Sequence, residues 1–282
     1  MVGRLAMRAN YLAQVPLSIV FILASRRIHP AYRLTLARKL ILGARMFWNA
    51  RRIPTASSPK AHLAMALKIL EAPPEIHGDV VECGTWKGGS AANLSLVCEI
   101  AGRRLVVFDS FQGLPEGVEG DREAVSYAPG DFHGSLEEVR ENVSRYGCLG
   151  VCEFVPGWFE RTLPAYEGPV LLAYLDVDLE ASLETCVREL WPKLLDCGHV
   201  FIDEYFELDY CALFWSEWWW REHFDRAPPG LIGAGAGLAL GEYFIGPLGS
   251  DEDHPTQHPS GGAYTAKGFS GEWSFGRDRR RS

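Results

Sequence analysis

Two kinds of segment alternate in the middle of the chain. Short apolar runs typical of buried parallel strands occur at residues 79–83, 104–108, 151–155, 170–175 and 199–202. Segments with the length and apolar spacing of helices lie between several of them, at residues 90–100, 136–146 and 181–195. This alternation predicts an α/β fold built on a Rossmann-like, mostly parallel, doubly wound sheet.

The regions before and after this alternation have a different character. Residues 1–75 read as a basic, N-terminal helical extension, whose last helix, 60–72, ends at Pro73-Pro74. The α/β domain is expected over residues 76–248, with a tryptophan-rich helix at 214–224 and a late strand at 238–245. Residues 249–282 are rich in Gly, Ser, Pro, His and Arg, which predicts a flexible tail.

An apolar segment near the N-terminus, Tyr11 to Ala24, is flanked by arginines on both sides. It is too short for a membrane-spanning helix. We favour a helix that packs on the body of the protein or on a partner subunit. We also expect the chain to form a homo-oligomer. A helix lying on a membrane surface is the alternative interpretation.

Charge and cysteine content argue against several classes of protein. The formal net charge of −8 over 282 residues argues against a nucleic-acid partner, because phosphate binding needs a basic surface. The seven cysteines are scattered and form no CxxC pair. This usage fits reduced thiols in a cytoplasmic protein better than a disulfide framework or a zinc site.

Two pairs of acidic residues follow two neighbouring strands. Asp176 and Asp178 follow the run 170–175, and Asp203 and Glu204 follow the run 199–202. Parallel strands place their carboxyl ends on one edge of a sheet, so the four carboxylates should converge where such sheets bind ligands. Like charges at one place need a cation or shared protons, and carboxylate oxygens suit Mg²⁺. Helix capping, for instance by Asp178, is the alternative, but two pairs at equivalent strand ends favour a site.

A glycine-bearing turn joins the first strand to its helix. Gly84 and Gly88 permit a tight turn and a close approach of a ligand to the backbone. The turn matches neither the GxGxxG nor the GxxxxGK[ST] pattern, which disfavours dinucleotide and P-loop sites. Asp109 ends the second strand, where an acidic side chain can hold a ribose diol or simply stabilise a turn.

Five motifs in order along residues 81–205 together resemble the macrocin O-methyltransferase family. They are VECGTWKGGS (81–90), FDSFQGLP (108–115), GWFERTLP (157–164), LDVDL (175–179) and FIDEY (201–205). The resemblance implies a class I methyltransferase fold and a metal-dependent enzyme that uses S-adenosylmethionine to methylate hydroxyls of sugars in natural products.

The resemblance also implies a role for each matching residue. Glu82, Gly84, Thr85 and Gly88 would hold the amino-acid end of S-adenosylmethionine, and Asp109 would hold its ribose. The adenosine would be flanked by Ser110 and Phe111 and the adenine by Gly157, Trp158 and Phe159. Asp178 would be the general base, and Mg²⁺ would be bound by Asp176, Asp203 and Glu204.

The chain departs from the family pattern in places that concern the acceptor. Asp203-Glu204 stands where the family usually has Asp-Asp, and Glu180 where it has Tyr. After Tyr205 the likeness ends, and we interpret the tryptophans at 215 and 218–220 as core or subunit interface rather than a substrate wall. The expected partner is a small-molecule acceptor, a sugar or glycosylated natural product. A catechol- or phenol-type O-methyltransferase, or a non-catalytic module that binds S-adenosylmethionine and a partner, remains an alternative.

Overall fold

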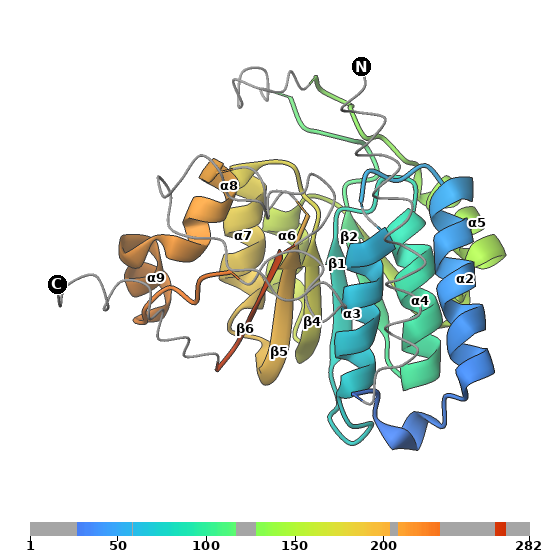
Figure 1. The fold of residues 1–282 in the computed structure, drawn as a ribbon. Helices are drawn as coiled ribbons and strands as arrows, with labels where there is room; N and C mark the ends of the chain where they lie inside the picture. Colours follow the sequence, from blue (N-terminus) through green and yellow to red (C-terminus); the bar gives the residue numbers. More distant parts are fainter. Residues whose placement is uncertain (1–26, 58, 117–127, 204–207, 232–262, 269–282) are drawn as a thin grey trace, which may run out of the picture.

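The computed structural model describes residues 27–57, 59–116, 128–203, 208–231 and 263–268. Within these ranges, one sheet of six strands runs through the molecule in the order β3-β2-β1-β4-β5-β6 (Figure 1). Its strands are β1 (Asp79–Cys83), β2 (Leu105–Asp109), β3 (Cys152–Pro156), β4 (Val170–Leu175), β5 (Leu194–Ile202) and β6 (Ala263–Ala266).

The strand order fixes where a ligand can enter. The first five strands are parallel, and β6 pairs antiparallel with the outer side of β5. From β1 the chain proceeds outward to β2 and β3, then crosses back to β4 on the other side of β1. Connections on the two sides of such a switch point diverge, which leaves a crevice at the carboxyl ends of β1 and β4.

Helices cover both faces of the sheet (Figure 1). One layer contains α2 (Leu36–Arg52), α3 (Pro59–Glu71), α4 (Gly89–Ala101) and α5 (Leu136–Tyr146). The opposite side carries α6 (Phe159–Thr162), α7 (Glu180–Leu190), α8 (Leu208–Ala212) and α9 (Glu217–Phe224). Short 3₁₀ turns are η1 (Pro30–Tyr32), η2 (Leu149–Val151), η3 (Leu163–Ala165) and η4 (Leu213–Trp215).

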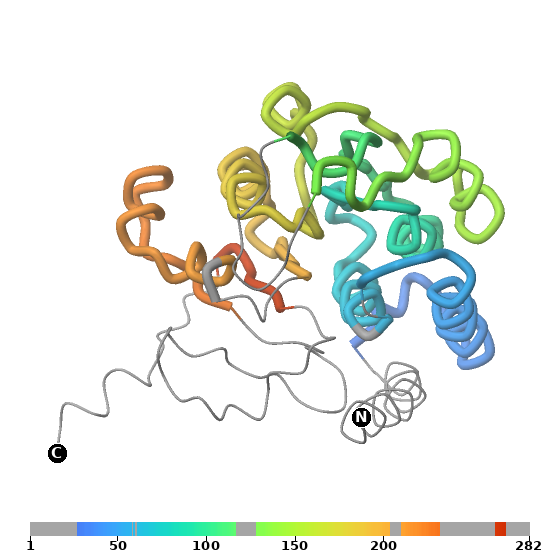
Figure 2. The backbone as a smooth tube through the Cα atoms, turned by 90° about the horizontal axis from the view of Figure 1, so that it is seen from above, coloured from blue at the N-terminus to red at the C-terminus, as the bar shows by residue number. Residues whose placement is uncertain are grey.

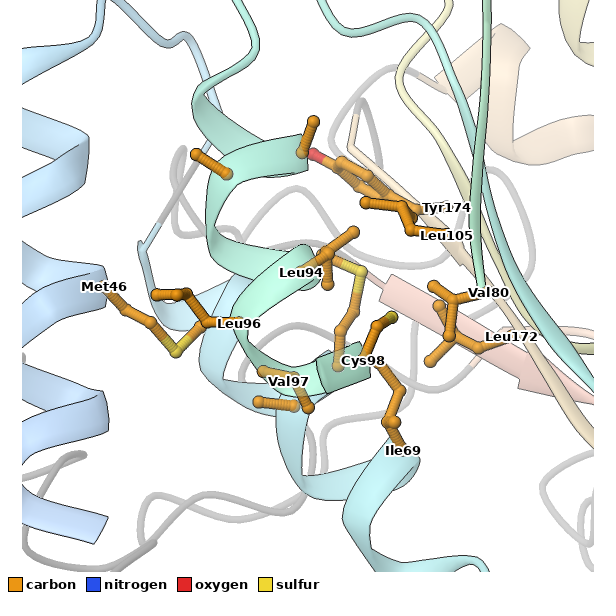
Figure 3. Close-up of a cluster of buried hydrophobic side chains, with 14 of the residues drawn as sticks. Met46, Ile69, Val80, Leu94, Leu96, Val97, Cys98, Leu105, Leu172 and Tyr174 are labelled. Atoms are coloured by element: carbon orange, nitrogen blue, oxygen red, sulfur yellow. The ribbon is translucent and has the colours of Figure 1, made fainter. Parts of the chain in front are cut away.

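Side-chain alternation along the strands divides the core into two halves. In β4, Leu172 and Tyr174 face α3 and α4, whereas Ala173 and Leu175 belong to the half under α7. Figure 3 shows the first half, where Val80, Leu105, Leu172 and Tyr174 of the sheet meet Ile69 of α3, Met46 of α2 and four residues of α4. The view in Figure 2 shows α2, α3 and α4 side by side on this face. The N-terminal helices are therefore part of the same packed body as the sheet.

The structure confirms the five strands predicted between residues 79 and 202 and most of the helices, with three corrections. The helix expected over 181–195 ends at Leu190, and β5 begins at Leu194, because Pro192 cannot continue a helix. The helix expected over 214–224 is divided at Ser216, whose hydroxyl accepts a hydrogen bond from the Trp219 N–H and starts α9. Residues 263–266, inside the expected tail, form β6.

Other expectations concern residues that the structure does not describe. The apolar segment Tyr11–Ala24 and the late strand at 238–245 both lie outside the described ranges. Among the helices that are described, none is long and apolar enough to cross a membrane.

Candidate active site

A cavity of about 350 Å³ opens at the carboxyl ends of β1, β2 and β4, at the switch point of the sheet. It brings together predicted residues from four separate stretches of the chain. These lining residues are Gly84, Thr85, Asp109, Ser110, Gly157, Trp158, Phe159, Asp176 and Asp178.

Gly84 lies where the turn after β1 passes under the end of β4. Its N–H donates to the Phe108 carbonyl at 2.9 Å, and its φ of +80° is in the left-handed region. A Cβ atom added at this position would lie only 1.8 Å from the Asp176 carbonyl oxygen. Gly88, also at φ +80°, is the N-cap of α4. Glycine is thus required for a turn that opens the floor of the cavity.

Asp109 is held at the end of β2 by backbone donors. Its Oδ2 accepts from the Thr85 N–H at 2.8 Å and its Oδ1 from the Phe111 N–H at 2.7 Å. Burial raises the pKa of this carboxyl, and the backbone hydrogen bonds oppose the increase. An ionised carboxylate has about four acceptor sites. Both oxygens can therefore still accept hydrogen bonds from a diol in the cavity.

Glu82 lies behind the cavity wall and is fully buried beneath α4. Ser90, which lines the cavity, donates to Glu82 Oε1. Burial raises the Glu82 pKa to about 8; the Ser90 hydroxyl lowers it, the negative charge of Asp109 raises it and the Thr85 hydroxyl lowers it. A buried carboxyl of this kind favours a nearby cationic group such as the ammonium of S-adenosylmethionine.

The other predicted adenosine residues separate into two groups. The stretch Gly157–Phe159 lines the cavity, and the Gly157 N–H donates to the Asp109 carbonyl at 2.9 Å. Ser110 also lines it, with its hydroxyl directed to the Gly113 carbonyl at 3.0 Å. Phe111, in contrast, is buried in the core against Phe154. The structure therefore places the Phe111 ring away from the expected adenosine position.

Tyr174 connects two of the predicted metal ligands, of which Asp176 lines the cavity. Its hydroxyl lies 2.8 Å from Asp203 Oδ1 and 3.2 Å from Asp176 Oδ2. Burial raises the Asp203 pKa to about 6; the Tyr174 hydrogen bond lowers it, and the negative charge of Asp178 raises it further. The carboxylates from β4 and β5 therefore converge, as the sequence predicts.

Asp178 reaches this region through a turn rather than a strand. β4 ends at Leu175, Asp178 has a φ of +57°, and the Leu179 N–H donates to the Val177 carbonyl at 2.6 Å. Asp178 therefore lies in the turn between β4 and α7 rather than in the strand. The capping interpretation is wrong, because the N-cap of α7 is Leu179. A positive φ is uncommon for a non-glycine residue, although aspartate adopts it more readily than most residues do.

The carboxylates that follow β4 and β5 are suited to binding a hard cation, but the structure describes only some of them. The described residues contain no group of three or more His, Cys, Asp or Glu side chains arranged to hold a metal ion. Glu204, the third predicted ligand, lies outside the described ranges. Asp176 and Asp203 offer carboxylate oxygens next to a hydroxyl, which is chemistry that Mg²⁺ accepts.

The sequence analysis missed one wall of the cavity. Thr55 and Ala56, in the loop between α2 and α3, line it directly. The next residue, Ser57, hydrogen-bonds to Tyr174 and, at 2.9 Å, to Nε2 of the buried His62. Asn93 of α4 contacts the other ring nitrogen of His62 at 2.9 Å. Small polar residues in a loop give no periodic signal, so the sequence alone could not reveal this network.

The tryptophan-rich segment is part of the core, as its preferred interpretation predicts. Trp219 and Trp220 are buried, and Trp220 packs edge-on against Trp191 with ring centroids 4.7 Å apart. The Trp220 indole N–H donates to the Leu213 carbonyl at 2.7 Å. Trp218 points outward and is 71% exposed.

The chain is similar in sequence to known O-methyltransferases. The sequence model of the macrocin O-methyltransferase family matches residues 61–227, so the likeness begins before the first motif and continues beyond Tyr205, where it was expected to end. An 8-demethyl-8-(2,3-dimethoxy-α-L-rhamnosyl)-tetracenomycin-C 4′-O-methyltransferase from Streptomyces olivaceus is 40% identical over 147 residues, 48% of this chain and 56% of the relative. The demethyldecarbamoylnovobiocin O-methyltransferase of Streptomyces niveus is 34% identical over 162 residues, 54% of this chain and 61% of the relative.

A solved structure extends the likeness to most of the fold. The O-methyltransferase NovP superposes with a TM-score of 0.57 at 24% sequence identity, covering 91% of this chain and 99% of that one. This likeness confirms the predicted Rossmann-like class I methyltransferase fold.

Proposed function

Because the chain belongs to the macrocin O-methyltransferase family, we propose that it transfers the methyl group of S-adenosylmethionine to a hydroxyl of a sugar or glycosylated natural product. The observation that supports this most is one cavity lined by two chemically different sets of residues. Asp109 and the Gly84 turn form the first set, and Asp176 and Asp178, which follow β4 next to that turn, form the second. A methyl donor and a hydroxyl acceptor can therefore meet inside it.

In this proposal the first set of residues, the Gly84 turn and Asp109, binds S-adenosylmethionine. Asp109 accepts hydrogen bonds from the ribose hydroxyls, and Gly157–Phe159 lie beside the adenine. Glu82, together with its neighbour Ser90, attracts the ammonium group. The methyl group is already activated by the sulfonium, so the main task of the protein is to hold the acceptor oxygen in line with it.

The second set of residues, Asp176 and Asp178, lies where the acceptor hydroxyl would lose its proton. A sugar hydroxyl is a poor nucleophile until it loses its proton, and Asp178 is the base that we propose for this step. Mg²⁺ held by Asp176, Asp203 and Glu204 would lower the pKa of a hydroxyl bound to it. The positive φ of Asp178 and its closeness to Asp203 support an assignment near the ion.

The proposal is tested by incubating the full chain with S-adenosylmethionine and a panel of glycosides, with methylated products identified by mass spectrometry. Asp178→Asn keeps the size of the side chain but removes its basicity, so kcat should fall by roughly 10²–10⁴ with cofactor affinity nearly intact. Asp176→Asn should instead raise the Mg²⁺ concentration needed for activity.

Asp196→Asn is the matched control, because Asp196 is exposed near the opposite end of β5. Full turnover after exhaustive chelation would exclude the metal part of the proposal. Near-normal turnover by Asp178→Asn would remove that residue as the base. A chain that binds S-adenosylmethionine but methylates no glycoside, and instead methylates a catechol, would point to the phenol-type reaction.

A further inference from the structure

Large apolar side chains are exposed mainly on one helix. Among the described residues, five large hydrophobic side chains are exposed to solvent, and four of them lie on α2. They are Leu36, Leu40, Ile41 and Trp48, with 63%, 46%, 60% and 52% of their surface exposed. Isolated exposed apolar residues need no explanation, but a cluster on one element marks an interaction surface.

The spacing of these residues puts them on one face. Leu36, Leu40 and Trp48 recur at multiples of four residues along the helix, and Ile41 adjoins this row. The opposite face, with Met46 and Asn49, is buried against the rest of the helical layer. Figures 1 and 2 show α2 at the periphery of that layer. The helix is therefore apolar on its outward side as well as its inward side.

Positive charge accompanies the apolar face. The helix contains five basic residues and no acidic one, in a chain whose net charge is −8. Arg38, Arg45 and Arg52 recur every seven residues, so they lie along one border of the apolar row. Apolar side chains including a tryptophan, bordered by arginines, are typical of helices that lie in a membrane interface.

A groove beside the helix has the same mixed character. It encloses about 250 Å³ between α2 and α4, with Arg38 and Arg45 among its lining residues. Most of its other lining side chains are apolar, although Glu99 also contributes.

We propose that the outward face of α2 docks on an anionic lipid surface. Leu36, Leu40, Ile41 and Trp48 enter the interface, and the arginine row contacts the negative headgroups. Charge disfavours an antiparallel second copy of this helix as the occupant. Antiparallel pairing of two α2 helices about a two-fold axis would bring the arginine rows together, and like charges at contact are unfavourable. The arginine-flanked apolar segment Tyr11–Ala24 adds the same combination just before the described chain.

The test is sedimentation of the full chain with phosphatidylcholine vesicles, with and without phosphatidylglycerol. Binding is expected only to the anionic vesicles, and added salt should weaken it. The variant Leu40→Glu with Ile41→Glu should bind at least about tenfold more weakly, because two apolar contacts become charged ones. Trp218→Glu is the control, since Trp218 is at 71% even more exposed than Leu40 and Ile41 but lies on α9.

Three outcomes would overturn the proposal. The wild-type chain could fail to bind anionic vesicles. The α2 variant could bind as well as the wild type, which would assign binding to another segment. Light scattering without lipid could show that the α2 variant changes an oligomer into monomers, which would make this face a contact between copies. Circular dichroism of each variant checks that the fold is retained.

Discussion

Glu82 is the residue whose surroundings change its chemistry most clearly. It is fully buried, and its pKa is raised from 4.5 to about 8. A carboxyl with a raised pKa keeps its proton in the folded state at a pH where the unfolded chain has lost it. Its contribution to stability is therefore complete below about pH 4.5 and is lost as the pH rises towards about 8.

We predict that Glu82→Gln removes this pH dependence. Between about pH 5 and pH 8 the wild type should lose free energy of unfolding relative to the variant, on the order of a few kcal/mol. Urea denaturation of both proteins across this range measures the difference, in which other titrating groups cancel. S-adenosylmethionine should reduce the pH dependence of the wild type if its ammonium meets Glu82. Parallel curves for the two proteins would show that Glu82 titrates normally.

Residue identity revealed much of the site but not its geometry. The positions of Gly84, Asp109, Asp176 and Asp203 follow from strand ends, so motifs and topology locate them together. The orientation of Phe111 does not follow, because its positive φ of 55° turns the ring into the core. A backbone conformation of this kind depends on the tertiary structure around it rather than on the local sequence.

At the scale of elements, strands were easier to predict than the segments that join them. A fully buried strand such as β4 leaves an unbroken apolar run, and its predicted bounds are those observed. The first part of β5 has exposed positions at Asp196 and Cys197, so its sequence resembles the end of a helix. β6 is four residues long and pairs only at the sheet edge, so it leaves a weak pattern.

The crossing of the β1 turn and β4 gives a prediction at this scale. Gly84→Ala adds strain at a positive φ and a Cβ 1.8 Å from the Asp176 carbonyl oxygen, which cannot retreat without parting the two strands. The free energy of unfolding should fall by at least about 2 kcal/mol. Affinity for S-adenosylmethionine should fall as well, because the turn forms the cavity floor.

Gly102→Ala is the control for backbone strain alone. Gly102 has a φ of +65°, but a Cβ there would meet nothing within 4 Å. Its cost should be about 1 kcal/mol, with cofactor affinity unchanged. Denaturant unfolding and calorimetry compare the two variants. Equal losses would contradict the close approach of β1 and β4.

At the scale of the whole molecule, hydrogen bonds connect the N-terminal helices to the acidic residues at the ends of β4 and β5. Asn93 of α4 occupies His62 Nδ1, so the ring proton is on Nε2 and is donated to Ser57. Burial lowers the His62 pKa to about 4, which keeps the ring neutral. Ser57 in turn bonds Tyr174, whose hydroxyl donates to Asp203. Residues far apart in sequence thus orient one carboxylate.

The last prediction tests that coupling by a double-mutant cycle of Ser57→Ala and Tyr174→Phe. Each removes one hydroxyl from a buried chain of hydrogen bonds, so the partners left behind are unsatisfied. We expect the effects on the free energy of unfolding to be non-additive by about 0.5–3 kcal/mol. Tyr174→Phe should also lower kcat, because Asp203 loses its donor.

In the control cycle, Ser57→Ala is combined with Tyr166→Phe. The Tyr166 hydroxyl donates to Asp79 at 2.7 Å, outside this network. That pair should be additive within about 0.5 kcal/mol. Additivity in both cycles would mean that the helical layer and the acidic pair are independent. Coupling in the first alone would show that the N-terminal layer helps to position the site.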